Sequence, residues 1–250
     1  MRYTNAPERR AHLERQIASD GYLSSAETAR LLGVSEMTVR RDLRLLEEQG
    51  LLRRVAGGAT SPSAGVSFEG RDAIGTRQKR TIAALAAEEA AGAETVALDA
   101  GTTVAALVPL LSVRTVVTHS LPVIETVTRT GSPGLIAAGG HYQPDTRSFA
   151  GPLTEETLRG MRCDIAFLSA TAVGGDGLWG TNALDAAIKR IIARQSSRVV
   201  LLAGAEKLRL TAPVRIAGLD IIDVLITDRR ADRAVLVPFE DAGVEVRIAR

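Results

Sequence analysis

The sequence has few of the residues on which disulfide-linked, metal-binding and membrane proteins depend. Of its 250 residues, one is a cysteine, Cys163, and three are histidines. One cysteine cannot close a disulfide within the chain, and the scattered histidines have no metal-ligand spacing. No apolar run approaches the ~20 residues of a membrane-spanning helix, and the charged N-terminus does not resemble a signal peptide. We therefore expect a cytoplasmic protein with no membrane partner, no metal and no cofactor.

Net charge is also scarce, but it is unevenly placed. The formal net charge is +2, and residues 1–60 hold ten Arg against eight Asp and Glu, so the whole excess lies there. The other residues carry equal numbers of positive and negative side chains. Such a small excess is modest for a nucleic-acid-binding domain, so a local cluster of arginines would have to supply the attraction.

One N-terminal segment has the signals of a helix with two contrasting faces. Ser35 is a favourable N-cap and Gly50 a favourable stop. Val39, Leu43 and Leu46 recur at helical spacing and predict a buried stripe. The opposite face carries Met37, Thr38, Arg40, Arg41, Arg44 and Glu48. A solvated charged face is the simpler interpretation, but the arginines gather near the N-terminus, where the helix dipole disfavours positive charge.

The preceding residues predict a second helix and a tight turn. Ser24 to Glu27 has the spacing of a capping box, and the helix would run to Leu32 with Ala26 and Ala29 facing inward. Gly33 ends it three residues before the next helix starts. Two short helices joined in this way describe a helix-turn-helix, whose second helix enters the major groove of DNA. A further helix is expected from residue 8 to residue 20, with Leu13 and Ile17 packed against this motif.

A wing is expected after the second helix of the motif. Leu51 to Ala56 is typical of a strand, and Gly57-Gly58 of a turn, which would place Arg53 and Arg54 near DNA phosphates. The predicted DNA contacts are Ser35, Met37, Thr38, Arg40, Arg41, Arg44, Arg53 and Arg54. Because one helix reads few base pairs, we expect a homodimer or homotetramer bound to paired half-sites of double-stranded operator DNA.

These motifs resemble the N-terminal signature of the DeoR family of bacterial transcriptional regulators. The matching residues are Val34-Ser35, Thr38 to Leu43, Leu46-Glu47, Gly50, Arg53 to Val55 and Gly57 to Ala59. The resemblance implies a DNA-binding regulator, usually a repressor. It also implies a second domain that senses a phosphorylated sugar or a related metabolite.

The rest of the chain predicts an α/β domain. Residues 60–70 have the composition of a linker, which separates a winged helix-turn-helix at 1–59 from an effector domain at 71–250. A helix is expected from Arg71 to Ala91. Short apolar runs then alternate with helical stretches, which predicts a doubly wound, mostly parallel sheet. The expected strands are Thr95–Leu98, Thr115–Thr118, Gly134–Ala138, Asp164–Ser169, Arg198–Ala203, Asp223–Thr227 and Val244–Ile248.

Ligands of such sheets bind beyond the carboxyl ends of the strands. The first run is followed by Asp99-Ala100-Gly101-Thr102-Thr103, whose glycine, amides and hydroxyls suit an anion at a helix start. An ordinary helix cap is the alternative. Ser120 and the pair Gly139-Gly140 follow the next two runs. Lys189 and Lys207 are the cations expected to reach this crevice, although a surface pairing of Lys189 with Asp185 at i−4 would also explain that lysine.

These residues resemble the effector-domain motifs of the DeoR family in their usual order, together with Gly151, Cys163 to Phe167 and Ile226 to Asp228. That domain is related in fold to ribose-5-phosphate isomerase. The resemblance implies that Gly101 to Thr103 and Ser120 hold a phosphate. The complete set of expected effector contacts is Asp99, Gly101, Thr102, Thr103, Ser120, Gly139, Gly140, Lys189 and Lys207.

The chain departs from the family pattern at three places. Ala203 stands where the family has an Asp, His119 where it has an Asn, and Leu168 to Thr171 replaces a glycine-rich turn. These departures imply an unusual effector or weakened sensing. We expect His119 to cap a helix or face solvent rather than contact the ligand. Cys163 is expected in the core and Trp179 in loop packing.

Two other functional classes are open to such a chain. A sugar-phosphate isomerase would need carboxylates for enolisation. The acidic segment of the isomerase corresponds best to Cys163 to Phe167 of this chain, and only Asp164 of its carboxylates is present. An architectural DNA-binding protein without a ligand would leave the α/β domain without a task. We therefore expect a regulator without enzymatic activity.

Overall fold

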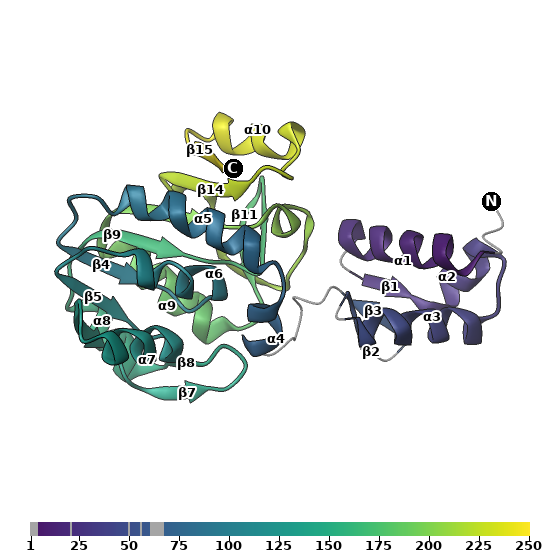
Figure 1. Ribbon diagram of the computed structural model, residues 1–250, viewed down its shortest axis with the longest axis horizontal. Coiled ribbons are helices and arrows are strands. Elements are labelled where there is room, and N and C mark those ends of the chain that lie inside the picture. Colours follow the sequence, from purple (N-terminus) through teal and green to yellow (C-terminus); the bar gives the residue numbers. More distant parts are fainter. Residues whose placement is uncertain (1–4, 21, 50, 56, 61–67) are drawn as a thin grey trace.

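The computed structural model describes residues 5–20, 22–49, 51–55, 57–60 and 68–250 (Figure 1). The N-terminal part contains three helices and three short strands within these residues. They are α1 (Ala6–Asp20), β1 (Tyr22–Ser24), α2 (Ser25–Leu32), α3 (Glu36–Glu48), β2 (Arg53–Val55) and β3 (Gly58–Thr60). The strands form one antiparallel sheet in the order β1-β3-β2, so the β2–β3 hairpin is the predicted wing.

The helix-turn-helix forms where the capping residues predict it. The Ser24 side chain accepts a hydrogen bond from the amide of Glu27, and Gly33 ends α2 in the left-handed conformation (φ 66°). Ser35 then caps α3 by accepting from the amide of Thr38. The three helices, β1 and the wing share one apolar core, made of Leu13, Ile17, Leu23, Ala29, Leu32, Val39, Leu43, Leu46, Leu52 and Ala59.

Some details of this part differ from the sequence prediction. Ala26 is exposed, and Ser25 and Thr28 take inward positions beside Ala29, so the buried face of α2 is shifted slightly around the helix from the predicted one. Gly58 belongs to β3 rather than to the turn, which leaves Gly57 (φ 81°) as the glycine that reverses the chain. The expected helix stop at Gly50 lies outside the described residues.

A buried ion pair ties α1 to α3. Asp42 lies on the inner side of α3, and its carboxylate is 2.5 Å from Nε of Arg9, which is also buried. Arg10 approaches the same carboxylate at 4.0 Å from a more exposed position. Charge pairs at such depth fix one arrangement of two helices, because separating them leaves an uncompensated buried charge. The orientation of α3 is therefore held by both apolar packing and this pair.

The second part begins with two helices instead of the single predicted one. They are α4 (Phe68–Ala73) and α5 (Thr76–Glu89), and Gly75 separates them in the left-handed conformation (φ 65°), which stops the first helix and leaves Ile74 exposed. Elements extend into the predicted linker at both ends: Thr60 belongs to β3, and α4 starts at Phe68. Residues 61–67 lie outside the described residues.

All seven predicted strands form and pair in one parallel sheet. They are β4 (Thr95–Leu98), β5 (Thr115–Thr118), β6 (Gly134–Ala137), β9 (Cys163–Leu168), β12 (Ser196–Leu202), β14 (Val224–Asp228) and β15 (Glu245–Ala249). Their order is β15-β14-β12-β9-β4-β5-β6. The chain builds outward from β4 to β6, returns to the other side of β4 with β9, and builds outward again. The direction thus reverses between β4 and β9, which is the topological switch point where open α/β sheets bind ligands.

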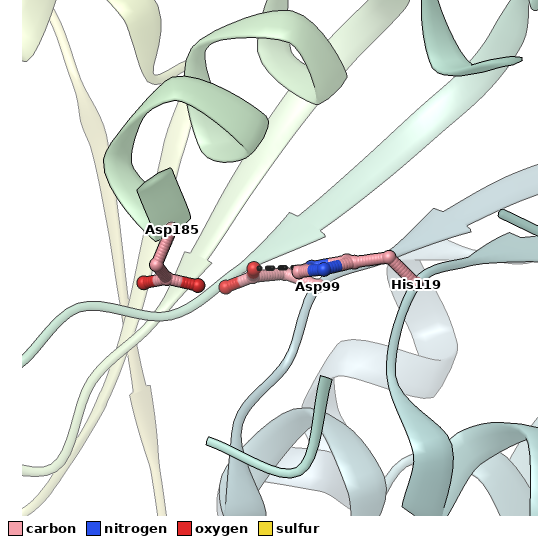
Figure 2. Close-up of side chains that lie close together, drawn as sticks. All are labelled: Asp99, His119 and Asp185. Carbon is pink, nitrogen blue, oxygen red and sulfur yellow. Dashed lines mark hydrogen bonds and ion pairs between the residues drawn. The ribbon is translucent and has the colours of Figure 1, made fainter. Parts of the chain in front are cut away.

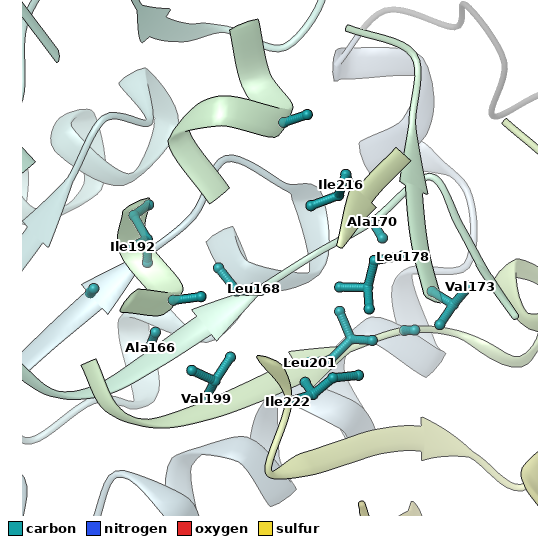
Figure 3. Packing of buried hydrophobic residues seen from close by; sticks show 14 of the residues in the cluster. Ala166, Leu168, Ala170, Val173, Leu178, Ile192, Val199, Leu201, Ile216 and Ile222 are labelled. Atoms are coloured by element: carbon teal, nitrogen blue, oxygen red, sulfur yellow. The ribbon is translucent and has the colours of Figure 1, made fainter. Parts of the chain in front are cut away.

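Helices cover both faces of this sheet, so successive side chains along each strand point alternately into two apolar clusters. One cluster joins residues such as Ala166, Leu168 and Leu201 to α8 (Pro152–Arg159), α9 (Ala183–Arg194) and α10 (Arg233–Asp241) (Figure 3). The other joins Leu98, Phe167 and their neighbours to α5, α6 (Thr102–Ala105) and α7 (Leu121–Thr130). The period-two pattern of buried strands accounts for this three-layer arrangement.

Short elements that the sequence did not predict complete the second part. The hairpin of β7 (His141–Gln143) and β8 (Ser148–Ala150) follows β6. A second small sheet has the order β10-β11-β13, from Ala172–Gly174, Gly177–Gly180 and Val214–Ala217. Trp179 therefore lies in a strand, not in a loop as predicted. The remaining elements are the 3₁₀ turns η1 (Val108–Leu110), η2 (Ala205–Arg209) and η3 (Leu219–Ile221). Among the described residues, no helix is long and apolar enough to cross a bilayer.

Candidate functional site

The outer face of α3 presents the side chains that the sequence predicted there. Met37 is 74% exposed, and Arg40, Arg41 and Arg44 are exposed as well. Arg40 pairs with Glu36 at 2.6 Å and Arg44 with Glu48 at 3.8 Å, both one turn away on the same helix. Arg41 has no charged partner among the described residues. Its guanidinium is therefore the one on this face that no carboxylate holds in place.

The residues around this helix have more restricted roles. The hydroxyls of Ser35 and Thr38 lie 2.8 Å apart and bond to each other at the helix start. Arg54 in the wing is held by Glu47, with 2.6 Å between Nε and Oε2. The Arg53 side chain lies outside the described residues. Arg54 of the wing is thus tied to α3, so the wing and the helix together form one surface.

A second candidate site lies at the switch point, and Asp99 is its centre. Asp99 directly follows β4 and is fully buried. Its Oδ2 accepts hydrogen bonds from the amide of Ser169 (2.8 Å), the hydroxyl of Ser169 (2.9 Å) and Nζ of Lys189 (2.5 Å). Its Oδ1 lies 3.3 Å from Nε2 of His119. The ends of β4, β5 and β9 and the middle of α9 thus meet on one carboxylate.

Lys189 is a buried ammonium between two carboxylates, not a surface lysine. Besides Asp99 it contacts Asp185 at 3.4 Å, the i−4 neighbour on α9 that the sequence indicated. Burial lowers the pKa of Lys189, but the two carboxylates outweigh this and raise it. Burial raises the pKa of Asp99, but the Lys189 charge and His119 more than compensate and lower it. Burial also raises the pKa of Asp185, and there the Lys189 charge compensates only in part.

His119 corrects the sequence prediction, because it neither faces solvent nor caps a helix. Its side chain is fully buried, with Nδ1 2.8 Å from the carbonyl oxygen of Phe149 and Nε2 facing Asp99 (Figure 2). A carbonyl and a carboxylate can only accept hydrogen bonds, so each ring nitrogen of His119 faces an acceptor. With Lys189 and the two aspartates it forms one buried polar group.

The same group has the donor types of a metal site, and the geometry argues against that use. One ligand atom from each of Asp99, His119 and Asp185 lies within 4.8 Å of the others. Figure 2 shows Asp185 pointing from the start of α9 toward the Asp99 carboxylate. However, Nζ of Lys189 bonds to both carboxylates. The ammonium therefore already supplies the positive charge that a metal ion would bring.

The predicted anion loop leaves β4 beside this group. Thr102 and Thr103 begin α6 and are almost fully buried, and Ser120 at the end of β5 is fully buried. The Ser120 hydroxyl has no hydrogen-bond partner among the residues that the structure describes. At Gly101, an added Cβ would lie 2.3 Å from the Ser169 hydroxyl oxygen, so the close approach of Ser169 explains this glycine. Sequence reasoning missed the Asp99–Ser169 contact because 70 positions separate the residues.

Lys207 lies at the same edge of the sheet. Its Nζ donates to the carbonyl oxygen of Ala170, which adjoins Ser169. Burial lowers the pKa of Lys207 to about 8; Glu206 opposes the shift, and Arg71, Lys189 and Lys79 add to it. Three other cations are therefore close enough to affect its charge. Lys207 remains largely protonated at neutral pH, with two donor positions beyond its single hydrogen bond.

Gly139 and Gly140 have structural partners instead. The carbonyl oxygen of Gly139 accepts from the hydroxyl of Thr154 in α8. A Cβ on Gly140 would lie 2.1 Å from the same hydroxyl oxygen, and its φ of 153° is unsuited to other residues. The described contacts place these two glycines against α8 and do not join them to the Asp99 group.

The buried pair of Lys189 and Asp99 yields a stability prediction. Lys189→Met should lower the free energy of unfolding of the second part by about 3–5 kcal/mol, because it strands a buried carboxylate. Urea unfolding followed by Trp179 fluorescence measures this. Arg194→Met on the exposed end of the same helix is the control and should cost below about 0.5 kcal/mol. Equal effects of the two substitutions would contradict a structural role for the pair.

Family models match both parts of the chain. A model described as the DeoR-like helix-turn-helix domain matches residues 9–64, and one described as the DeoR C terminal sensor domain matches residues 75–229. Among solved structures, ribose 5-phosphate isomerase A from Methanocaldococcus jannaschii is similar over 52% of each chain, at 17% identity and a TM-score of 0.36. That score is too low to support an argument about function.

Curated relatives match over nearly the whole chain. The putative aga operon transcriptional repressor of Escherichia coli O157:H7 is 30% identical, over 98% of this chain and 94% of its own length. The L-fucose operon activator of Haemophilus influenzae is 32% identical over 85% and 88%. The glycerol-3-phosphate regulon repressor of Escherichia coli K12 is 29% identical over 93% and 94%. With its winged helix-turn-helix, its α/β sensor domain and these matches, the chain belongs to the DeoR family of transcriptional regulators.

Proposed function

We propose that the protein represses a carbohydrate or related metabolic operon and is released from its operator by a phosphorylated, sugar-like effector. The proposal that the protein binds DNA rests on the outer face of α3. Met37 and three arginines project there from a helix whose other face is buried. Relatives named as repressors of an aga operon and of a glycerol-3-phosphate regulon support repression. The relative named as an activator marks the alternative direction of control. The protein would work in the cytoplasm.

The effector would bind at the carboxyl ends of β4, β5 and β9. Support comes from the unpartnered hydroxyl of Ser120, the spare donors of Lys207 and the amides that start α6 at Thr102. Asp99 and Lys189 would position this crevice and not touch the effector, because each already bonds to several buried groups. Gly139 and Gly140 would act only through the backbone. The sensor domain would span 71–250, as the sequence predicts.

An isomerase activity receives no comparable support. Enolisation requires a carboxylate that can reach a substrate carbon and exchange protons with it. The Asp99 carboxylate is buried and fully hydrogen-bonded. Asp164 is the second residue of β9, at the opposite ends of the strands, where it accepts from the amides of Glu94 and Thr95. We therefore infer a binding protein rather than an enzyme.

We also propose that the active form is a homodimer or homotetramer. One α3 helix contacts few base pairs, and two copies can read half-sites about one DNA turn apart, or a multiple of that spacing. Sedimentation of the full chain at micromolar concentration should give at least a dimer, with a two-part operator footprint. A monomer that protects a single half-site would contradict this.

Arg41, whose guanidinium pairs with no carboxylate among the described residues, is predicted to contribute to the recognition of DNA sequence. Arg41→Ala should weaken operator binding by about 1–3 kcal/mol and relax the base preference at one position, if the side chain reads a base edge. Competition between operator and random duplexes measures both effects. Arg129→Ala, an exposed arginine on α7, is the matched control. Unchanged affinity and preference in Arg41→Ala would remove this residue from the reading surface.

The proposed phosphate loop predicts loss of effector response. Thr102→Glu should place a carboxylate in the anion site, so that operator binding no longer responds to the phosphosugar that most raises the wild-type melting temperature. Operator affinity is measured with and without that compound. Thr128→Glu, exposed on α7, should respond normally. A full response of Thr102→Glu, folded and bound to operator, would mean that the loop is only a structural turn.

A further inference from the structure

A second hollow, lined by arginines, lies at the carboxyl ends of β14 and β15, on the same side of the sheet as the proposed effector crevice. Its volume is about 150 Å³, and three segments line it: the start of α5, the turn after β14 and the end of β15. The α5 residues are Arg77, Gln78 and Thr81, and the others include Arg229, Arg230 and Arg250. Four exposed arginines thus line a space that is large enough for a small oxyanion.

Part of this positive charge is not balanced by carboxylates within the protein. Asp228, the acidic residue of the hollow, accepts from Arg230 at 2.7 Å and from the amide of Ala205. Arg230 also bonds to Glu206 at 3.1 Å. Arg77, Arg229 and Arg250 have no hydrogen-bond or charged partner among the described residues. Because guanidinium groups stay charged at any physiological pH, their mutual repulsion persists until an anion enters.

The start of α5 adds to the same preference. Gly75 at its N-cap gives no side-chain cap, and the first turn contains no acidic residue. Arg77 therefore lies at the positive end of a 14-residue helix, where a cation is unfavourable. Lys79, two residues on, turns away to the carbonyl oxygens of Arg71 and Asp72. An anion in the hollow would be attracted both by the arginines and by this helix end.

The hollow is separate from the proposed effector crevice. The crevice lies at the ends of β4, β5 and β9, whereas β14 and β15 lie on the far side of β12 in the sheet. Glu206 of η2 bonds to Arg230 at the hollow, whereas Lys207 of the same turn bonds to the carbonyl oxygen of Ala170 in the crevice. The two sites therefore share an edge of the sheet but no lining residue.

We propose that this hollow is a second anion site, which binds the phosphate group of a small soluble molecule through Arg77, Arg229 and Arg250. Arginine suits phosphate because its planar group of donors matches two oxygens at once. Gln78 supplies a side-chain amide for the remaining oxygens, whereas the Thr81 hydroxyl already donates to the carbonyl oxygen of Gln78. A phosphate of the DNA backbone has the same chemistry, so the test has to distinguish the two sources.

Calorimetric titration of the full chain with pyrophosphate, at constant ionic strength, tests the site. The double variant Arg77→Gln/Arg229→Gln should lose binding at one site, with an affinity at least about tenfold weaker there. The control Arg114→Gln/Arg129→Gln removes the same charge from exposed positions elsewhere and should bind as wild type does. Retained wild-type binding in the first variant would overturn the proposal.

Thr102→Glu separates this site from the effector site. Wild type should bind two pyrophosphates per chain, and Thr102→Glu should keep the one that depends on Arg77. One site in wild type that survives in Thr102→Glu and disappears in Arg77→Gln/Arg229→Gln would leave this inference intact and remove the proposed effector loop. Loss of all binding in Thr102→Glu would overturn the inference instead.

A random-sequence duplex distinguishes free phosphate from DNA. The Arg77→Gln/Arg229→Gln variant should bind this duplex with the same affinity and salt dependence as Arg114→Gln/Arg129→Gln. Weaker binding to the duplex, with pyrophosphate binding unchanged, would assign these arginines to the DNA backbone and overturn the small-molecule site.

Discussion

A carboxylate that is ionised without access to water is costly, and the second half of this protein is arranged around one. Asp99 sits at the point where the strand order of the sheet reverses, and its charge is balanced by Lys189 from the middle of α9. In a buried site neither partner can be removed cheaply, because the other would remain unsolvated. The pair therefore fixes the distance between the end of β4 and α9. The proposed effector contacts at the carboxyl ends of the strands lie next to that fixed point.

Two of the departures from the family pattern, at His119 and at Ser169, involve the same carboxylate. His119 and Ser169 come from different strand ends, and both bond to the Asp99 carboxylate. Ser169 also occupies the space beside Gly101, and the described contacts leave the carboxylate no obvious role as an acceptor for sugar hydroxyls. Recognition would then depend on Ser120, Lys207 and backbone amides. The proposed site would then select for negative charge more than for the pattern of hydroxyls on a ring.

A continuous set of contacts links this site to the first helix after the linker. His119 and Phe149 exchange hydrogen bonds, and the hairpin that contains Phe149 also carries Arg147. The Arg147 guanidinium lies 5.9 Å from the ring centre of Phe68 in α4. Arg71, also in α4, donates to the carbonyl oxygen of Asp145 in the same hairpin. These contacts form one contiguous path of packed groups from the end of β5 to α4.

The sequence alone determined the elements whose signals are local. Caps at Ser24 and Ser35 placed two helices, and seven apolar runs placed all seven strands of the parallel sheet, because helix ends and buried strands depend on neighbouring residues. The charged face of α3 followed from spacing in the same way. Only the tertiary structure decided which distant residues meet: Asp42 with Arg9, Asp99 with Ser169 and His119, and the arginines around the second hollow. These contacts join positions far apart in the chain, and a buried histidine such as His119 has the same local sequence signal as an exposed one.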